Sequence, residues 1–166
     1  MPPTQAATFS AFAKRLFVET YAAQNADNQT NFNAYLAQSF GTDIQRSELS
    51  DRSKVTMWAT DDNGPAGYFQ LVFDQPAPID LNIDSVCELK RFYVDKPWQG
   101  TGLAYRQMEH AIEQARLRAF GLWLGVWSEN AHAIRFYERA GLQRRGTVTF
   151  HLGDDPQQDD VYALTW

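Results

Sequence analysis

The chain has 166 residues, of which 44% are hydrophobic and 21% are charged, and its formal net charge at pH 7 is −5. This length can bury a core within one domain, which we expect to span residues 1–166. The acidic balance argues against nucleic-acid binding, which requires clustered positive charge, and suits cationic partners instead.

Residue counts and spacings restrict the compartment and the cofactors. The single cysteine, Cys87, excludes an internal disulfide and a cysteine-rich metal site. No two histidines have metal-site spacing with a carboxylate, so we expect no metal. No apolar run reaches 18 residues, and Lys14, Arg15 and Glu19 interrupt the N-terminal segment where a signal peptide would be hydrophobic. We therefore expect a cytoplasmic protein without a membrane partner.

The N-terminal part predicts two helices. Residues 1–9 are rich in proline and alanine and are expected to be loose. From Ser10 onward apolar residues recur at helical spacing, and a second helical pattern contains Phe32 and stops at Gly41. Residues 10–41 thus predict a helical hairpin, whose aromatic side chains either pack in the core or wall a substrate pocket.

Short apolar runs bounded by turn residues predict a series of β-strands. They cover residues 54–60, 66–73, 87–94, 122–127, 144–152 and 160–166. A hairpin turn is expected at 61–65 and an acidic turn at 154–159, whereas 45–49 fits a short strand or the start of a helix. With the helices, these runs predict an α/β fold with a mixed, mostly antiparallel sheet of six or seven strands flanked by about four helices.

The segment 87–141 is a strand, a loop, a helix, a strand and a helix in succession. Its loop has the sequence Gln99-Gly100-Thr101-Gly102-Leu103-Ala104. The glycines let the backbone approach a bulky anion, and the amides of the first helical turn have no intrahelical partner. These amides lie at the positive end of the helix dipole, so the loop suits a phosphate or pyrophosphate. The alternative is an ordinary strand-to-helix turn.

Two motifs in this segment resemble those of the GCN5-related N-acetyltransferases (GNAT family). Their acetyl-CoA loop carries Gln or Arg, two variable residues, Gly, one variable residue, and Gly or Ala, as residues 99–104 do. Their next block is an asparagine before a helix that contains Phe-Tyr and ends in Gly-Leu. Here that block is Asn130 to Leu142, with Phe136-Tyr137 inside it.

One branch of the family is especially similar. The run Trp123 to Trp127 and the aspartate-rich tail from Phe150 to Asp159 resemble the PaiA-type polyamine N-acetyltransferases. The resemblance covers residues 87–166 and is faint before them. It implies an acetyl-CoA-binding core at 87–141, and it favours the helical hairpin as a wall of the acceptor site.

The resemblance implies that acetyl-CoA is the co-substrate and assigns residues to it. The loop amides from Gln99 to Ala104 would hold the pyrophosphate. The backbone of Phe92-Tyr93-Val94 would pair with the pantetheine arm, and Asn130 would contact that arm or cap the following helix. The central strand would splay from strand 122–127, with the thioester in the gap.

Acetyl transfer to an amine also needs a proton donor and a proton acceptor. Tyr137 is the expected donor. A phenol of pKa about 10 can donate a proton to a thiolate, because the corresponding thiol has a pKa of about 8.5 and the difference is small. Its alternative is a core tyrosine. A primary amine of pKa about 10.4 is almost wholly protonated at neutral pH, so a base is required. Glu88, which alternates with Lys90 and Phe92, is the candidate, acting through water if burial raises its pKa; its alternative is a salt-bridged carboxylate.

The sequence therefore indicates an N-acetyltransferase acting on a small primary amine, with a polyamine such as spermidine as the first choice. A protein N-terminus, a lysine or an aminoglycoside is the alternative acceptor, and a non-catalytic CoA-binding regulator is the alternative class. We expect direct attack on the thioester, because Cys87 has no activating base next to it. The aspartates of the tail either attract a polyamine or are solvated loop charge, and strands near the C-terminus suit a homodimer.

Overall fold

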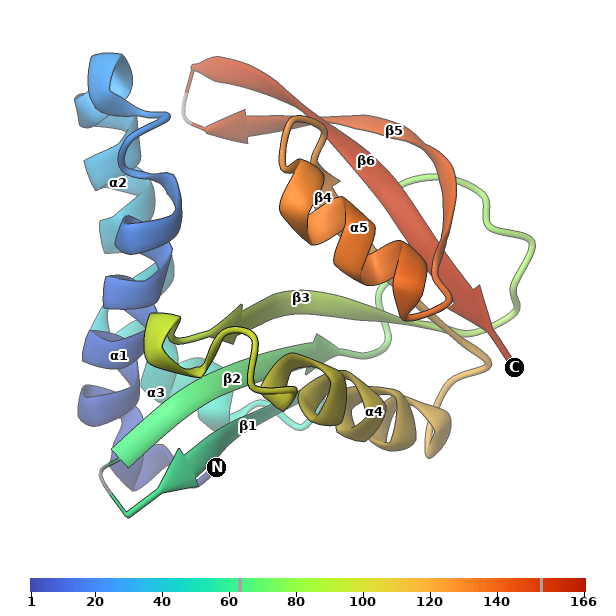
Figure 1. Cartoon of the computed structure of the whole chain (residues 1–166), viewed down its shortest axis with the longest axis horizontal. Helices are drawn as coiled ribbons and strands as arrows, with labels where there is room; N and C mark the ends of the chain where they lie inside the picture. Colours follow the sequence, from blue (N-terminus) through green and yellow to red (C-terminus); the bar gives the residue numbers. More distant parts are fainter. Residues whose placement is uncertain (63, 153) are drawn as a thin grey trace.

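A computed structural model describes residues 1–62, 64–152 and 154–166. The turn expected at 61–65 contains Asn63 and the aspartate-rich tail contains Gly153, and these two residues lie outside the described ranges. Six strands form one sheet in the order β1-β2-β3-β4-β6-β5 (Figure 1). They are β1 (Lys54–Asp61), β2 (Gly64–Val72), β3 (Val86–Val94), β4 (Gly121–Trp127), β5 (Gln143–Leu152) and β6 (Asp155–Thr165).

The sheet is antiparallel except at its centre, which confirms the expected mixed sheet. β3 and β4 run parallel and pair over three residues only, Val86–Glu88 with Gly121–Trp123. A parallel pair needs a crossover, and helix α4 (Leu103–Arg116) supplies it. Beyond Glu88 the two strands diverge, so the sheet opens between them.

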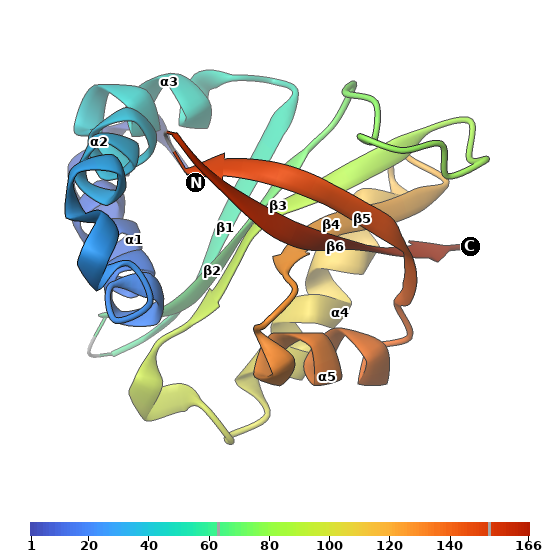
Figure 2. The ribbon, with the colours of Figure 1, turned by 90° about the horizontal axis from the view of Figure 1, so that it is seen from above.

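Five α-helices cover the two faces of the sheet, one more than expected. Helices α1 (Ala6–Tyr21), α2 (Gln29–Phe40) and α3 (Thr42–Ser50) lie on one face, and α4 and α5 (Ala131–Arg139) lie on the other (Figure 2). The additional helix is α3, in the segment that the sequence left open. Among the described residues, no helix has the length and apolar character needed to cross a bilayer.

The expectation that residues 1–9 are loose is wrong. A 3-10 turn occupies Pro3–Gln5, and α1 follows directly from Ala6. Phe9 is fully buried and contacts Tyr68 of β2 edge-on, with 5.0 Å between the ring centroids. Proline suits the first position of a helical turn and alanine favours helix, so the composition that suggested a loose end starts a helix here.

The acidic segment expected as a turn is mostly strand. β6 begins at Asp155, and Asp159 pairs with Val148 of β5 and with Trp127 of β4. Asp155, Gln157 and Asp159 are half-buried, whereas the residues between them are exposed. Pairing on both sides of β6 overrides the low strand propensity of aspartate.

A β-bulge in β3 separates residues that simple alternation would place together. The register between β2 and β3 shifts so that it skips Lys90. Phe92 therefore stacks on Phe136 of α5, with ring centroids 5.5 Å apart, while Glu88 lies on the opposite face with α1 and α2. The expected alternation of Glu88, Lys90 and Phe92 on one face is wrong at Phe92.

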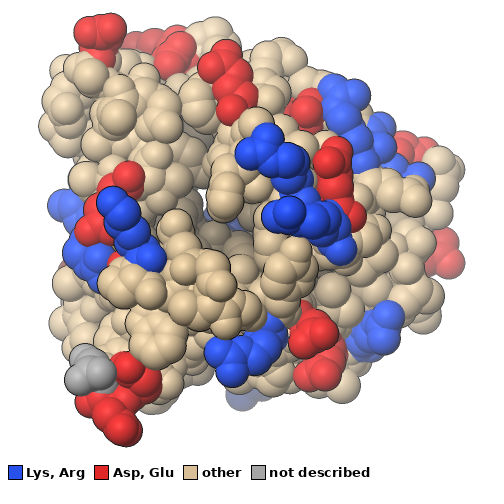
Figure 3. Space-filling model, in the orientation of Figure 1, with Lys and Arg blue, Asp and Glu red and all other residues tan. Residues whose placement is uncertain are grey.

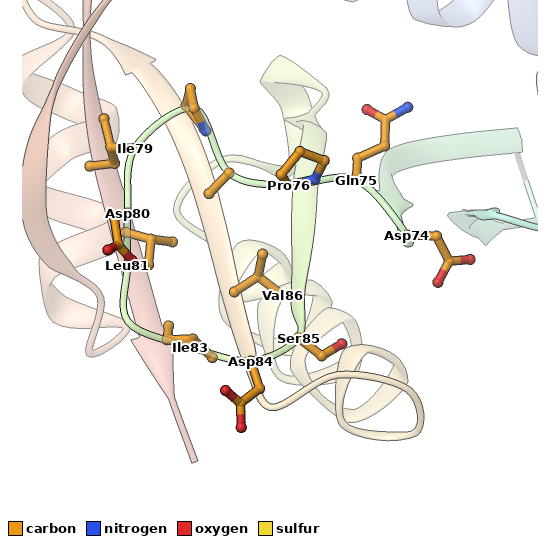
Figure 4. Close-up of a pocket in the computed structure, with 12 residues that line it drawn as sticks. Asp74, Gln75, Pro76, Ile79, Asp80, Leu81, Ile83, Asp84, Ser85 and Val86 are labelled. Atoms are coloured by element: carbon orange, nitrogen blue, oxygen red, sulfur yellow. The ribbon is translucent and has the colours of Figure 1, made fainter.

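A loop between β2 and β3 covers the outer part of the sheet. It encloses a hollow of about 500 Å³ lined by residues 74–81 and 83–86 (Figure 4). Ile79 and Leu81 of this loop pack against a buried cluster that includes Trp123 and Val161. Pro78, near the turn of the loop, also reaches the edge of the cavity that contains Glu88.

Candidate active site

A cavity of about 280 Å³, called here the loop cavity, lies where β3 and β4 diverge. Its walls come from β3, the start of α4, β4 and α5. It brings together most of the residues that the sequence assigned to the co-substrate and to the proton donor. These are Phe92, Tyr93, Val94, Gln99, Gly100, Ala104, Asn130 and Tyr137. Thr101, Gly102 and Leu103 do not line it.

The loop before α4 has the conformation that an anion site needs. Gly100 and Gly102 have φ angles of 78° and 86°, a region that residues with a Cβ rarely adopt. A Cβ built at either glycine meets no atom within 4 Å, so conformation rather than crowding requires glycine there. Gly102 immediately precedes α4, and no side chain caps the helix. The first-turn amides therefore remain available to a phosphate oxygen.

The open edge of β3 faces the same cavity. Phe92 and Tyr93 pair with β2 on one side, while the register with β4 ends at Glu88 on the other. Gln99 ties the loop to this strand, because its Nε2 donates to the carbonyl of Val94 over 3.2 Å. An extended amide-containing chain can thus add to this edge of the sheet as a further strand.

Helix α5 contributes two of the predicted residues. Asn130 accepts a hydrogen bond at Oδ1 from the amide of Ala133 over 3.1 Å, so it caps the helix as well as lining the cavity. Tyr137 lies on the half-buried side of α5 and contacts Phe92 edge-on. Its hydroxyl has no hydrogen-bond partner in the described part of the chain. Burial raises the pKa of the Tyr137 phenol, which keeps it protonated at neutral pH.

A second cavity of about 280 Å³, the hairpin cavity, lies on the face that carries α1 and α2. The β5–β6 hairpin forms its outer wall. Glu88 lines this cavity and not the loop cavity. Its remaining lining is rich in aromatic side chains, namely Phe17, Tyr21, Tyr35, Tyr93, Trp123, Trp127 and Phe150.

The two cavities meet at the opening between β3 and β4. Both are lined by Tyr21, Leu89, Lys90, Tyr93 and Gly125. The space-filling view, in the orientation of Figure 1, shows a hollow near the centre of the molecule, with Lys and Arg side chains gathered on the α5 side of it (Figure 3). The two cavities therefore lie on either side of the β3–β4 opening and share part of their walls.

Two carboxylates in the hairpin cavity are held in environments that favour their neutral forms. Burial raises the pKa of the Glu88 carboxyl, and the positive charges of Lys90 and Arg91 lower it by a smaller amount. Burial, together with the neighbouring Asp160, raises the pKa of Asp159 to about 6. Perturbed titratable groups in a cavity are a frequent property of functional sites.

Sequence reasoning did not single out Asp159 or the two tryptophans that accompany it, because the tail aspartates entered only as a group that either attracts a polyamine or is solvated loop charge. Asp159 was placed in a turn, where an aspartate is usually solvated, because its pairing with β4 and β5 is not visible in the chain. Trp123 and Trp127 entered only as part of a resemblance. Their alternation with Gly125 is the one signal that could have indicated a shared face.

Comparisons with known proteins identify the family and the fold. Residues 15–142 match the model of the acetyltransferase (GNAT) family. An uncharacterised N-acetyltransferase of Lactobacillus delbrueckii subsp. lactis is 30% identical over 152 residues, which is 91% of this chain and 86% of the relative. A spermine/spermidine N(1)-acetyltransferase of Bacillus subtilis (strain 168) is 35% identical over 65 residues, which is 38% of this chain and 43% of that protein.

Solved structures share the fold over the whole chain. The PaiA N-acetyltransferase from Thermoplasma acidophilum, in complex with coenzyme A, has a TM-score of 0.77 at 16% identity. The match covers 100% of this chain and 96% of the PaiA chain. A GCN5-related N-acetyltransferase from Rhodopseudomonas palustris has a TM-score of 0.72 at 15% identity, and the match covers 100% of this chain and 92% of that chain. The expected fold and resemblance are confirmed, and acetyl-CoA fits this family as the co-substrate. The chain belongs to the GNAT family of N-acetyltransferases.

Proposed function

We propose that the protein transfers the acetyl group of acetyl-CoA directly to a primary amine of a small polycation, with a polyamine such as spermidine as the leading acceptor. The observation that carries this proposal is the composition of the hairpin cavity. It combines the carboxylates of Glu88 and Asp159 with several aromatic rings. Carboxylates compensate the desolvation of an ammonium group, and aromatic faces attract cations at close range. The partial match to the spermine/spermidine acetyltransferase of B. subtilis supports the same choice.

The residues of the loop cavity suit acetyl-CoA, which supplies an acetyl group activated as a thioester when bound. The uncapped amides from Gly102 to Ala104 would donate to the pyrophosphate oxygens, and Gln99 would keep the loop against β3. The open edge of β3 at Phe92 and Tyr93 would pair with the amides of the pantetheine arm. The acyl end would then point into the opening that the hairpin cavity shares.

Glu88 is the proposed proton acceptor. It lies on the acceptor side of the sheet, and its raised pKa brings it closer to that of a useful general base. Trp123, its register partner on β4, has a buried Nε1–H without an acceptor among the described residues. A water molecule that accepts from Trp123 beside Glu88 would satisfy this donor and relay the proton from the amine.

Tyr137 is the proposed proton donor to the sulfur. Its hydroxyl borders the loop cavity and is not committed to another described group. The burial that raises the pKa of this phenol would also raise the pKa of a thiol in the same cavity. The difference between the two pKa values therefore stays small, and transfer of the proton from Tyr137 to the sulfur costs little free energy. Tyr137 and Glu88 thus act from opposite sides of the β3–β4 opening.

Direct transfer, rather than an acyl-enzyme, is part of the proposal. Cys87 has no exposed surface, lies in the main hydrophobic cluster and has a pKa raised by burial to about 12. A thiol in this state is a poor nucleophile at neutral pH. Alanine at this position is expected to leave kcat within about twofold of wild type, apart from a modest loss of stability.

The test is free-thiol release from acetyl-CoA against a panel of amines, with the acetylated product identified by mass. The panel contains spermidine, spermine, lysine, an aminoglycoside and a peptide beginning with alanine. We expect turnover with the polyamines at a kcat/KM at least about tenfold above the other acceptors. Faster turnover with the peptide or the aminoglycoside would replace the proposed acceptor. Thiol release with none of the panel would contradict the proposal for this acceptor class.

A further inference from the structure

We propose that Asp159 binds the acceptor ammonium that is to be acetylated, and that Gly125 leaves the space in which the Asp159 carboxylate lies. This makes the two residues determinants of acceptor specificity. The inference rests on the proposed acetyl transfer to an amine, and it assigns a binding role that the sequence motifs do not carry.

The position of the carboxylate is the first argument. Asp159 lies on β6 opposite Trp127 of β4, so its side chain shares a face with Gly125. A Cβ built at Gly125 would stand 3.3 Å from Oδ2 of Asp159, which places this oxygen directly over the glycine. Gly125 lines both cavities. The carboxylate therefore stands where an amine in the hairpin cavity faces the loop cavity.

The second argument is that the carboxylate lacks a partner. Among the described residues, Asp159 makes no side-chain hydrogen bond and no ion pair. Asp160, the next residue, pairs with Arg144 over 2.7 Å on the other face of the sheet. A half-buried carboxylate without a counter-charge is costly in free energy, and binding of a cation would remove that cost.

An independent observation also indicates a polar ligand in the same cavity. Trp123 is only 8% exposed, and its Nε1–H has no acceptor among the described residues. A buried donor of this kind is usually satisfied by a ligand or by water. The residues that line the hairpin cavity thus include an unpaired carboxylate and a tryptophan whose buried N–H has no acceptor, and an apolar ligand would leave both unpaired.

The charged surroundings of Asp159 set the pH range in which it can act. The titratable groups lining its cavity are Tyr21, Tyr35, Glu88, Lys90 and Tyr93, and Asp160 is the acidic neighbour on its own strand. Burial and Asp160 raise the pKa of Asp159 to about 6. Asp159 is therefore mostly ionised at pH 7.5 and loses its charge below pH 6, where we expect acceptor binding to weaken.

The proton balance assigns separate tasks to the two carboxylates. Asp159 holds the ammonium by charge. Glu88 receives the first proton of the ammonium through a water molecule and passes that proton to solvent. As the C–N bond forms and the C–S bond breaks, the nitrogen loses a second proton, and Tyr137 protonates the sulfur. The second proton restores Tyr137 through solvent, so the reaction releases one proton overall.

The test compares Asp159→Asn with Asp160→Asn, which removes the same charge one residue away on the opposite face. Spermidine is titrated by calorimetry into each protein saturated with CoA, and CoA affinity is measured separately. Asp159→Asn is expected to weaken spermidine binding about 30-fold or more, because truncating one partner of a desolvated charge pair has effects of this size. Asp160→Asn should change it by less than about threefold. CoA affinity should stay within about twofold in both.

Two further readouts exclude a merely structural effect. The spermidine affinity of wild type should fall below pH 6, and that of Asp159→Asn should not. Gly125→Ala keeps the charge but places a methyl group 3.3 Å from Oδ2, so it should also weaken spermidine binding. Equal affinity of wild type and Asp159→Asn, or an equal loss in Asp160→Asn, would overturn the inference.

The inference and the proposed function can fail separately. If wild type binds spermidine through Asp159 but releases no thiol with any amine, acetyl transfer to this acceptor is wrong and the binding site stands. If polyamines are acetylated and Asp159→Asn has an unchanged KM, the inference about Asp159 is wrong and the proposed function stands.

Discussion

Tyr137 and Glu88, the proposed proton donor and proton acceptor, line cavities on opposite sides of one opening in the sheet. Tyr137 borders the loop cavity and Glu88 the hairpin cavity. Burial raises both pKa values, which favours a protonated phenol and a carboxylate that binds protons more readily. Each residue can therefore be tested by a near-isosteric substitution that removes one function.

Tyr137→Phe should lower kcat about 10²-fold or more, because it removes a general acid without changing the shape of the cavity. CoA affinity should stay within about twofold. Tyr162→Phe is the matched control, since the Tyr162 hydroxyl donates to Glu138 outside both cavities. An unchanged kcat in Tyr137→Phe would remove this residue from the chemistry.

Glu88→Gln should lower kcat/KM for the amine about 10²-fold at pH 7 and leave CoA binding intact. The deficit should shrink toward pH 10, because the free amine becomes abundant without a protein base. The measurement is a pH–rate profile of thiol release for both proteins. A deficit that is constant across pH would show that Glu88 is not the base.

At this scale the motifs predicted the loop cavity better than the hairpin cavity. Gly100 belongs to the loop motif, and Asn130 and Tyr137 belong to the motif around α5, so local geometry fixes the residues within each motif. Asp159 depends on pairing with strands from two other parts of the chain. A sequence does not record that register, so the residue looked like solvated charge.

Among the elements, α3 is linked to the sheet by a buried ion pair. Glu48 of α3 accepts from Nη1 of Arg91 on β3 over 2.6 Å, and Arg91 is only 7% exposed. Gln45 of the same helix is fully buried. These buried polar residues explain why hydrophobic spacing did not reveal α3, since the inward side of the helix is polar.

Glu48→Gln should lower the free energy of unfolding by about 3 kcal/mol, because it leaves the Arg91 charge buried without its counter-ion. Urea unfolding at pH 7 measures the change. Asp43→Asn is the control on the same helix, since Asp43 pairs with Arg46 at the surface and should cost less than about 1 kcal/mol. Equal losses of unfolding free energy in the two variants would contradict the larger contribution assigned to the buried pair.

Over the whole molecule, the proposed active site arises from the divergence of β3 and β4. Helices on both faces help to form two cavities, which share lining residues at this opening. Strand and helix patterns predicted the elements because periodicity is local. The sequence did not indicate the bulge at Lys90, which separates Glu88 from Phe92, because a bulge depends on the partner strand.

The unpaired Asp159 should also affect the pH dependence of stability. A carboxyl whose pKa is about 6 in the folded state, above its ordinary value of 3.8, stabilises the fold fully below pH 3.8. That contribution is lost as pH rises through 6. Asp159→Asn should therefore raise the free energy of unfolding at pH 7 by about 1 kcal/mol relative to its effect at pH 4. Urea unfolding at both pH values tests this, and an effect of Asp159→Asn that is equal at pH 7 and pH 4, or less favourable at pH 7, would contradict it.

The most direct test of the account is a two-substrate kinetic analysis. Initial rates of thiol release are measured while acetyl-CoA and spermidine are both varied. If two joined cavities hold the substrates together for direct transfer, double-reciprocal plots should intersect, and Cys87→Ala should give the same pattern. Parallel lines would indicate an acyl-enzyme, and they would contradict direct transfer through the β3–β4 opening.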